Sequence, residues 1–262
     1  MGDLLVPHGE PPVYFTSASL TALGVPHATT TRHCPGIGAS GGAGSPFARA
    51  AGEVLAAGGL EMGRAAWARQ VHGAEVARVG GHGGFAGPAD ALVTTVPGVP
   101  LAIFTADCLA IVLVDREAPA LAVAHVGWRG AVRGTVQAAV AALMAAGARP
   151  ERVGAVISPS IGTCCYEVDA PVIEALSAAY PDGWRSWVTP GMDAEHWMLD
   201  LWAANTTFLE QAGVDPARIE SPRVCTACHV ETFYSYRKGH GGRLATIAAL
   251  PQADEKGPSA WQ

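Results

Sequence analysis

The middle of the chain alternates short apolar runs with turn-forming residues. Residues 99–105, 110–114, 120–125 and 153–157 are runs of this kind, with proline, aspartate or glycine at their ends. Short apolar runs that end at such residues are typical of buried strands. We therefore expect four strands in this part of the chain.

An alanine-rich stretch at residues 128–146 lies between the last two of these strands. Gly147 follows where a helix would stop, and Pro150 comes shortly after. One face of the stretch carries apolar side chains at helical spacing: Val132, Val136, Val140 and Leu143. A strand, a helix and a second strand form a crossover unit, which indicates an α/β protein.

Three further elements complete the predicted set. We expect helices over residues 171–179 and 200–212, and a final strand over residues 233–237. The strands outnumber those of a simple alternating fold. The sequence therefore predicts a single-domain layered sandwich with a mixed β-sheet core and flanking helices.

Composition narrows the class of protein. The 262 residues are 49% hydrophobic and 15% charged, which suits a large core and argues against disorder. The net charge is −6 and no run of lysine or arginine occurs, so a nucleic-acid partner is not expected. A few arginines would still suffice to hold a small anion.

The chain also carries few signs of a secreted or membrane protein. Its N-terminus does not read as a secretory signal, and no apolar stretch reaches the ~18 residues that span a membrane. In such a chain the six cysteines are expected to be reduced thiols or metal ligands. We expect a cytoplasmic protein with no membrane partner.

Three residues with metal-binding side chains stand at predicted strand ends. They are His72, Cys108 and His125. Ligands of α/β proteins gather at strand ends, and two imidazoles with one thiolate resemble a catalytic zinc site with an open position. Their wide spacing leaves an alternative, in which the histidines are hydrogen-bonded polar residues and Cys108 is a small core residue.

The ordered set of motifs along the chain resembles one family, the laccase-domain or multicopper polyphenol oxidase-like proteins. These motifs are TTR (30–32), RQVHG (69–73), DALVTTVPG (90–98), ADCLAIVLVD (106–115), AHVGWRG (124–130), SPSIGTCCYEV (158–168), LDLWAAN (199–205), CT (225–226) and FYSYRKGHGGRLATIA (233–248). The resemblance implies that His72, Cys108 and His125 bind Zn²⁺. It implies a lead-in segment at 1–28, a catalytic domain at 29–250 and a frayed tail at 251–262.

The chain departs from the family pattern in one region. Members usually carry a stretch like SLNLG and then GDD before QVHG, whereas residues 34–60 here are shortened and rich in glycine and alanine. If the missing loop shapes the substrate pocket, the choice of substrate is affected while the metal site is intact.

Four other residues are candidates for the site. Arg129 and Arg32 would bind a phosphate or carboxylate through their planar donors, or serve the local structure instead. Asp107 would orient a metal ligand, accept a proton, or cap a strand end. Gln70 would hydrogen-bond a purine or a water at the metal, or simply face solvent.

The remaining cysteines receive a structural interpretation. Cys164 and Cys165 are adjacent and are expected mainly to pack in the interior. Cys225-Thr-Ala-Cys228-His229 matches the haem attachment pattern, but attachment occurs outside the cytoplasm, and the resemblance implies that Cys228 is incidental. A zinc ribbon is not expected, because Cys164-Cys165 does not have the spacing of a second ligand pair.

The resemblance implies a zinc-dependent purine nucleoside enzyme. Such an enzyme would cleave adenosine-, inosine- or guanosine-type nucleosides with inorganic phosphate and deaminate adenosine with zinc-activated water. The alternative is a zinc amidohydrolase that removes a misincorporated L-serine from a UDP-muramyl precursor, and both need the same ligands. A monomer or homodimer is expected.

A copper-dependent polyphenol oxidase is a third function, which the family's older name suggests. Multicopper oxidases bind copper through many histidines in His-x-His pairs, whereas this chain has nine histidines and no such pair. Cu²⁺ could still occupy the His/Cys/His site, because copper exceeds zinc in affinity for such ligands.

Overall fold

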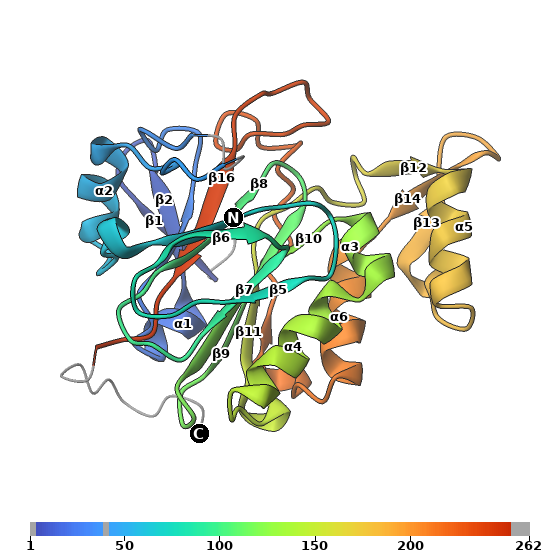
Figure 1. Cartoon of the computed structure of the whole chain (residues 1–262). Coiled ribbons are helices and arrows are strands. Elements are labelled where there is room, and N and C mark those ends of the chain that lie inside the picture. Colours follow the sequence, from blue (N-terminus) through green and yellow to red (C-terminus); the bar gives the residue numbers. More distant parts are fainter. Residues whose placement is uncertain (1–3, 39–41, 253–262) are drawn as a thin grey trace.

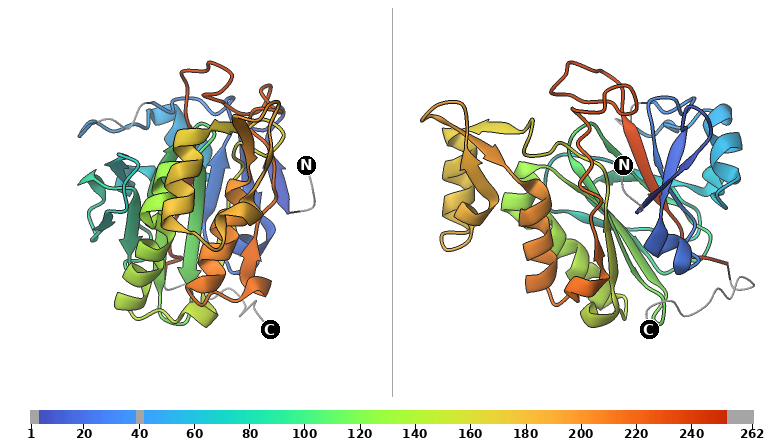
Figure 2. Two further views of the ribbon diagram at one scale, coloured as in Figure 1. Left: turned by 90° about the vertical axis from the view of Figure 1, so that its right-hand side faces the viewer. Right: turned by 180° about the vertical axis from the view of Figure 1, so that it is seen from behind.

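The computed structural model describes residues 4–38 and 42–252. Two large β-sheets, each mixed in strand direction, lie face to face, and helices cover the far side of one of them (Figures 1 and 2). This arrangement confirms the predicted α/β sandwich. Of the expected tail, only residues 251 and 252 are among the described residues. Within the described ranges, no helix is long and apolar enough to cross a membrane.

The first sheet has seven strands and contains strands from both ends of the described chain. In spatial order its strands are β1 (Leu5–His8), β2 (Tyr14–Ser17), β3 (His27–Thr30), β16 (Leu244–Ala248), β8 (Leu101–Thr105), β4 (Ala66–Arg69) and β6 (Gly84–Pro88). The last strand, β16, pairs antiparallel with both β3 and β8.

The second sheet has six strands, and its centre contains three of the four predicted apolar runs, whereas the run at residues 99–105 forms β8 of the first sheet. Its order is β15 (Ile219–Glu220), β11 (Gly154–Ile157), β9 (Leu109–Asp115), β10 (Ala120–Val126), β7 (Ala91–Thr94) and β5 (Val76–Arg78). Both β10 and β11 pair antiparallel with β9, so they run parallel to each other. The predicted crossover unit is therefore present, with β9 between its two strands.

A third, small sheet lies at one end of the molecule beside α5 (Figure 1). It consists of β12 (Glu167–Asp169), β14 (His196–Leu199) and β13 (Val188–Pro190). The helices are α1 (Ala18–Ala22), α2 (Arg49–Ala56), α3 (Trp128–Arg133), α4 (Thr135–Ala145), α5 (Ala170–Ala179) and α6 (Leu201–Gln211). Short 3₁₀ turns occupy Met62–Arg64, Pro150–Arg152, Trp184–Trp187 and Pro216–Arg218.

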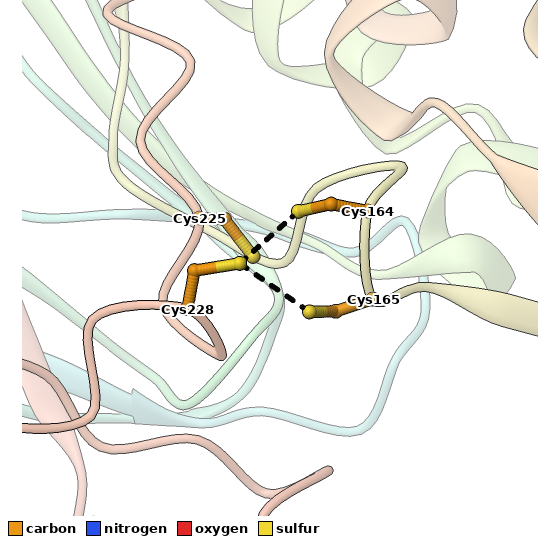
Figure 3. A group of neighbouring side chains, drawn as sticks. All are labelled: Cys164, Cys165, Cys225 and Cys228. Carbon is orange, nitrogen blue, oxygen red and sulfur yellow. Dashed lines mark hydrogen bonds between the residues drawn. The ribbon is translucent and has the colours of Figure 1, made fainter.

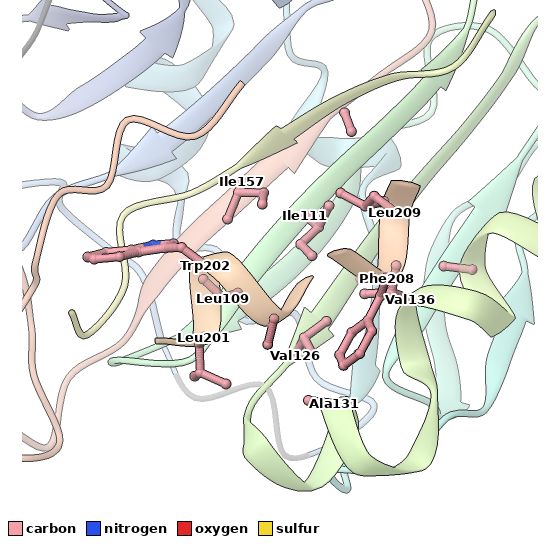
Figure 4. Close-up of a cluster of buried hydrophobic side chains, with 14 of the residues drawn as sticks. Leu109, Ile111, Val126, Ala131, Val136, Ile157, Leu201, Trp202, Phe208 and Leu209 are labelled. Atoms are coloured by element: carbon pink, nitrogen blue, oxygen red, sulfur yellow. The ribbon is translucent and has the colours of Figure 1, made fainter. Parts of the chain in front are cut away.

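Strand β9 shows why the central runs are apolar at every position. Successive side chains of a strand point to opposite faces. Leu109, Ile111 and Leu113 pack against the helices in one core cluster, of which Figure 4 labels Leu109 and Ile111. Val112 and Val114 pack against the seven-stranded sheet in another cluster. Both faces of β9 are thus buried. Each fully buried leucine or valine contributes about 1.5–3 kcal/mol relative to exposure.

The strand expected at residues 233–237 is absent, and this prediction is wrong. The segment forms turns, and the final strand is β16, further along the chain. The backbone N–H of Arg237 and the hydroxyl of Ser235 donate hydrogen bonds to the Asp107 carboxylate. Bonding to a side chain takes the place of strand pairing in this segment.

The predicted helix over 128–146 is divided into α3 and α4. Gly134 lies between them with φ +79°, in the left-handed region, so the chain changes direction there. The break lets the short α3 follow β10 directly while α4 packs along the sheet. The helices expected near residues 171–179 and 200–212 are confirmed as α5 and α6.

We predict that Gly134→Ala lowers the free energy of unfolding by about 1–2 kcal/mol, the cost of a left-handed backbone at alanine. Apart from the adjoining backbone, no heavy atom lies closer than 3.5 Å to the position of the added Cβ, so the loss would come from the backbone conformation alone. Urea denaturation measures the change. Gly134→Asn is the control and should lose less, because asparagine tolerates this conformation. An alanine variant as stable as the original protein would contradict the prediction.

Candidate metal centre and active-site cavity

The three sequence-predicted metal ligands come together although they are far apart in the chain. His72 lies in the turn after β4, Cys108 lies between β8 and β9, and His125 lies near the end of β10. One ligand atom from each lies within 4.8 Å of the others. The two imidazole rings meet edge to face, with centroids 4.7 Å apart. The group could therefore hold one metal ion.

A buried carboxylate, that of Asp90 directly before β7, positions both histidines. Its Oδ1 accepts hydrogen bonds from Nδ1 of His125 at 2.8 Å and from the backbone N–H of His72 at 2.9 Å. Its Oδ2 accepts the backbone N–H groups of Val71 and Gly73 at 3.1 and 2.6 Å. Because Nδ1 of His125 donates to Asp90, Nε2 is the ring atom available to a metal.

The charges around the two histidines give them different affinities for protons. Burial alone would lower the pKa of His125, but its hydrogen bonds with Asp90 and Cys108 outweigh burial and raise this pKa to about 9. Burial lowers the pKa of His72, and the charge of the neighbouring His125 lowers it further. A cation that binds this group at neutral pH therefore displaces a proton from His125.

The backbone is strained where it presents the ligands. His72 has φ +55° and Asp107, directly before Cys108, has φ +88°, a region that non-glycine residues rarely adopt. Such strain persists only where the surroundings hold it, and it is typical of functional sites. Gly127 lies against the ligands, since a Cβ there would come within 2.8 Å of Cys108 Sγ and 3.4 Å of His72 Nδ1.

The carboxylate of Asp107 is occupied by hydrogen bonds within the protein. Oδ1 accepts the Thr226 hydroxyl at 2.6 Å, and Oδ2 accepts the Ser235 hydroxyl at 3.0 Å and the Arg237 backbone N–H at 2.7 Å. The backbone carbonyl of Asp107 also accepts the N–H of Ile161 at 2.9 Å. Asp107, directly before Cys108, thus forms hydrogen bonds with three other segments of the chain, around Ile161, Thr226 and Ser235.

The three candidate ligands open into a cavity of about 600 Å³. Gln70, Asp107 and Arg129 line the same cavity, so the structure brings these sequence-predicted residues together with the metal group. Its other polar lining includes Tyr166 and three more arginines, Arg69, Arg237 and Arg243. The cavity therefore joins a possible metal site to a positively charged wall, which suits an anionic group.

The candidates Gln70 and Arg129 differ in how their side chains are engaged. The Gln70 amide donates to the backbone carbonyl of Phe104 at 2.7 Å and accepts its N–H at 2.8 Å, so it joins the end of β4 to β8. The exposed Arg129 guanidinium lies 4.2 Å from the centre of the Trp128 ring. Arg129 thus lies over the Trp128 ring at the edge of the cavity, where an arginine can bind an anionic ligand.

Arg32 lies elsewhere. Its guanidinium donates to the backbone carbonyl of Val230 and lies 5.3 Å from the centre of the Tyr234 ring. It is not among the residues that line the cavity. The structure therefore does not bring Arg32 together with the other candidates.

The donor set fits a zinc ion chemically. Imidazole nitrogen and thiolate sulfur are preferred zinc ligands, and catalytic zinc sites use three protein ligands with one position open to the substrate. A carboxylate that fixes the tautomer of a ligand histidine is also typical of such sites, and Asp90 does so for His125.

Sequence reasoning missed Asp90, Tyr166 and Arg237 as members of the site. Asp90 carried a detectable signal, because an acidic residue opens an apolar strand within the DALVTTVPG motif. Its partners lie 17 to 35 residues away, so their contact is visible only in the fold. Tyr166 and Arg237 carry no local signal of this kind.

The chain combines a layered α/β fold with a His/Cys/His group that could hold a metal ion beside a cavity. The family model described as multi-copper polyphenol oxidoreductase laccase matches residues 47–251. The chain belongs to this family, which confirms the resemblance seen in the motifs.

Two named proteins are similar to this chain in sequence, and a solved structure shares its fold. A purine nucleoside phosphorylase of Deinococcus radiodurans is 38% identical over 245 residues, covering 88% of this chain and 92% of that protein. Adenosine deaminase RL5, from an unknown prokaryotic organism, is 39% identical over 150 residues, covering 57% and 56%. The Bacillus licheniformis hypothetical protein YfiH shares the fold, with a TM-score of 0.83 at 22% identity, covering 95% of this chain and 100% of that chain.

We predict that Asp90→Asn weakens zinc binding at the His/Cys/His group by about 10- to 100-fold, the usual effect of losing a carboxylate behind a ligand histidine. Asparagine cannot accept all four hydrogen bonds that Asp90 accepts. Competition with a chelator of known affinity measures the change.

Asp193→Asn is the matched control for this variant. Asp193 also bonds a histidine, His196, at 2.7 Å, but this pair is exposed. Zinc affinity should be unchanged in the control. Equal affinity in both variants would show that Asp90 does not position the ligands.

Proposed function

We propose that this protein is a zinc-dependent purine nucleoside enzyme that cleaves nucleosides with phosphate and deaminates adenosine. The observation that carries the proposal is the shared cavity, in which the His72, Cys108 and His125 group faces four arginines. The names of the relatives, purine nucleoside phosphorylase and adenosine deaminase, supply the substrate class. A zinc ion bound here would supply a Lewis acid that activates water near neutral pH.

Arg129 is proposed to hold the phosphate. Its guanidinium lies over the Trp128 ring at the cavity, and its planar donors could give a phosphate two parallel hydrogen bonds. Arg69, which is exposed and lines the same cavity, is placed to add a second positive charge. Binding there would keep phosphate near the nucleoside and offset the entropy cost of joining two substrates. Arg32 is less favoured for this role because it lies off the cavity.

Asp107 and Gln70 are proposed as positioning residues. The side-chain oxygen atoms of both residues accept hydrogen bonds from neighbouring backbone or hydroxyl groups. These hydrogen bonds hold the segments that carry Cys108 and His72 in position. Tyr166 is half-buried at the cavity wall, and desolvation by burial raises the pKa of its hydroxyl. It therefore stays protonated near neutral pH and can donate a hydrogen bond to a substrate.

Copper chemistry of the multicopper type does not fit the described residues. Apart from a group of four cysteines, the described residues contain one group that could hold a metal, His72, Cys108 and His125. They therefore do not form a cluster of several histidine-bound copper ions.

We also propose that the protein is located in the cytoplasm and acts on small molecules as a monomer or homodimer. Its catalytic domain is proposed to span residues 29–250.

We predict that His125→Ala loses both phosphorolysis and deamination together with the metal of the His/Cys/His group. The two reactions share one metal in this proposal, so they should disappear together. Assays of inosine with phosphate and of adenosine alone measure the activities, and elemental analysis measures the metal. Full activity in the metal-free protein would contradict the proposal, as would release of serine from a muramyl precursor without any action on nucleosides.

We predict that Arg129→Ala raises the KM for phosphate by about 10- to 100-fold, the worth of a charge-assisted hydrogen bond. Deamination of adenosine uses no phosphate and should change much less. Arg185→Ala is the matched control, because Arg185 is exposed and stacks on Trp184 at 4.6 Å but does not line the cavity. An equal loss in both reactions would assign Arg129 to nucleoside binding instead.

A further inference from the structure

A second group of metal-binding side chains lies outside the cavity lining. Cys164 and Cys165 lie in the turn before β12, and Cys225 and Cys228 lie in the segment after β15. Their four sulfur atoms all lie within 4.8 Å of one another. Figure 3 shows the four side chains pointing toward a common centre from two loops. The prediction that Cys164 packs in the interior is wrong, because this side chain is exposed.

The spacing of the sulfur atoms matches a tetrahedral metal site. Sγ of Cys228 lies 3.3 Å from that of Cys164 and 3.5 Å from that of Cys165. A disulfide would bring two sulfurs to about 2.05 Å. Four thiolates about 2.3 Å from one zinc ion lie about 3.8 Å apart at the corners of a tetrahedron. The cluster is thus too open for disulfides and close to the size that one zinc ion requires.

The local backbone prepares each loop for this role. The N–H groups of Cys228 and His229 both donate to the carbonyl of Cys225, a tight turn that brings the two thiols of the Cys-x-x-Cys pair to one side. In the other loop the N–H groups of Cys165 and Tyr166 both donate to the carbonyl of Gly162. This turn lets adjacent cysteines face the same centre, which their sequence spacing did not suggest.

A backbone N–H also stabilises one sulfur of the group. Gly162 donates its N–H to Cys225 Sγ at 3.2 Å, and a donor at this position favours the thiolate that a metal needs. A Cβ at residue 162 would lie 2.6 Å from the Trp202 ring and 3.3 Å from the Cβ of Cys225. Only glycine therefore allows the two loops to approach this closely.

We propose that Cys164, Cys165, Cys225 and Cys228 bind a structural zinc ion. Four thiolates complete the tetrahedral coordination of zinc and leave no position for a substrate, unlike the His/Cys/His group. The proposal is independent of the proposed reaction at the cavity, because it rests on the positions of the four sulfur atoms and on the turns that carry them.

The proposed zinc ion would fasten one wall of the cavity. The carbonyl of Cys165 accepts a hydrogen bond from the Arg237 guanidinium at 3.2 Å, and Thr226, next to Cys225, bonds Asp107. Arg237 and Asp107 both line the cavity, and Asp107 adjoins Cys108. Joining the two cysteine loops thus holds in place the segments that present these residues.

Metal analysis of the full chain purified without chelators tests the proposal. We expect two zinc ions per chain in the original protein, and one in the double variant Cys164→Ser/Cys228→Ser. His125→Ala should also retain one, because it removes a ligand of the other group. Cys34→Ala is the matched control and should retain both, since Cys34 is a buried cysteine outside both groups. Circular dichroism checks that each variant is folded.

Cobalt substitution gives a second, spectroscopic measurement, made on the unaltered protein and on His125→Ala. Cobalt bound to four thiolates should add intense sulfur-to-cobalt charge-transfer bands and tetrahedral d–d bands, which persist in His125→Ala. One zinc ion per original chain, retained in the double cysteine variant, would overturn the proposal. So would iron in place of zinc, or a disulfide between any two of the four cysteines, which mass spectrometry after thiol alkylation detects.

Discussion

The carboxylate of Asp90 is the interaction on which the candidate metal centre depends. It is buried directly before β7 and accepts four hydrogen bonds, three from the backbone around His72 and one from the ring of His125. A buried charge is tolerated only when it is fully hydrogen-bonded, and these donors satisfy that condition. The same bonds hold His72 in a left-handed backbone and orient the His125 ring. Asp90 alone thus fixes the positions of two of the three candidate ligands.

Asp107 has the corresponding role for the third ligand. Its three side-chain hydrogen bonds reach Thr226, Ser235 and Arg237, so the last part of the chain is drawn to the strand end that carries Cys108. These bonds also explain why residues 233–237 are not a strand. One of the proposed ligands of the structural zinc ion, Cys225, directly precedes Thr226 in the sequence. The hydrogen bonds of Asp107 therefore stabilise the segment that carries Cys108. The proposed zinc ion would stabilise the two cysteine loops beside it.

The two cysteine-containing groups differ in the number of ligands that they offer, and this number distinguishes a catalytic metal site from a structural one. His72, Cys108 and His125 offer three ligands beside a cavity lined with arginines, an arrangement suited to binding a substrate next to a metal. The four cysteines offer a complete thiolate set on surface loops, suited to holding those loops together. A single chain can use zinc in both ways because the number of protein ligands decides whether a position is left open.

The sequence by itself determined the α/β class, the central strands, the crossover helix region and the family, because buried strands and helices leave periodic apolar patterns and the motifs are ordered along the chain. It also singled out His72, Cys108 and His125. Only the tertiary structure decided that Asp90 joins two of them, that Arg32 lies away from the cavity, and that Cys164 and Cys165 meet Cys225 and Cys228. The physical reason is that these contacts join residues tens to hundreds of positions apart, and their geometry depends on turns and left-handed backbones that spacing alone does not reveal.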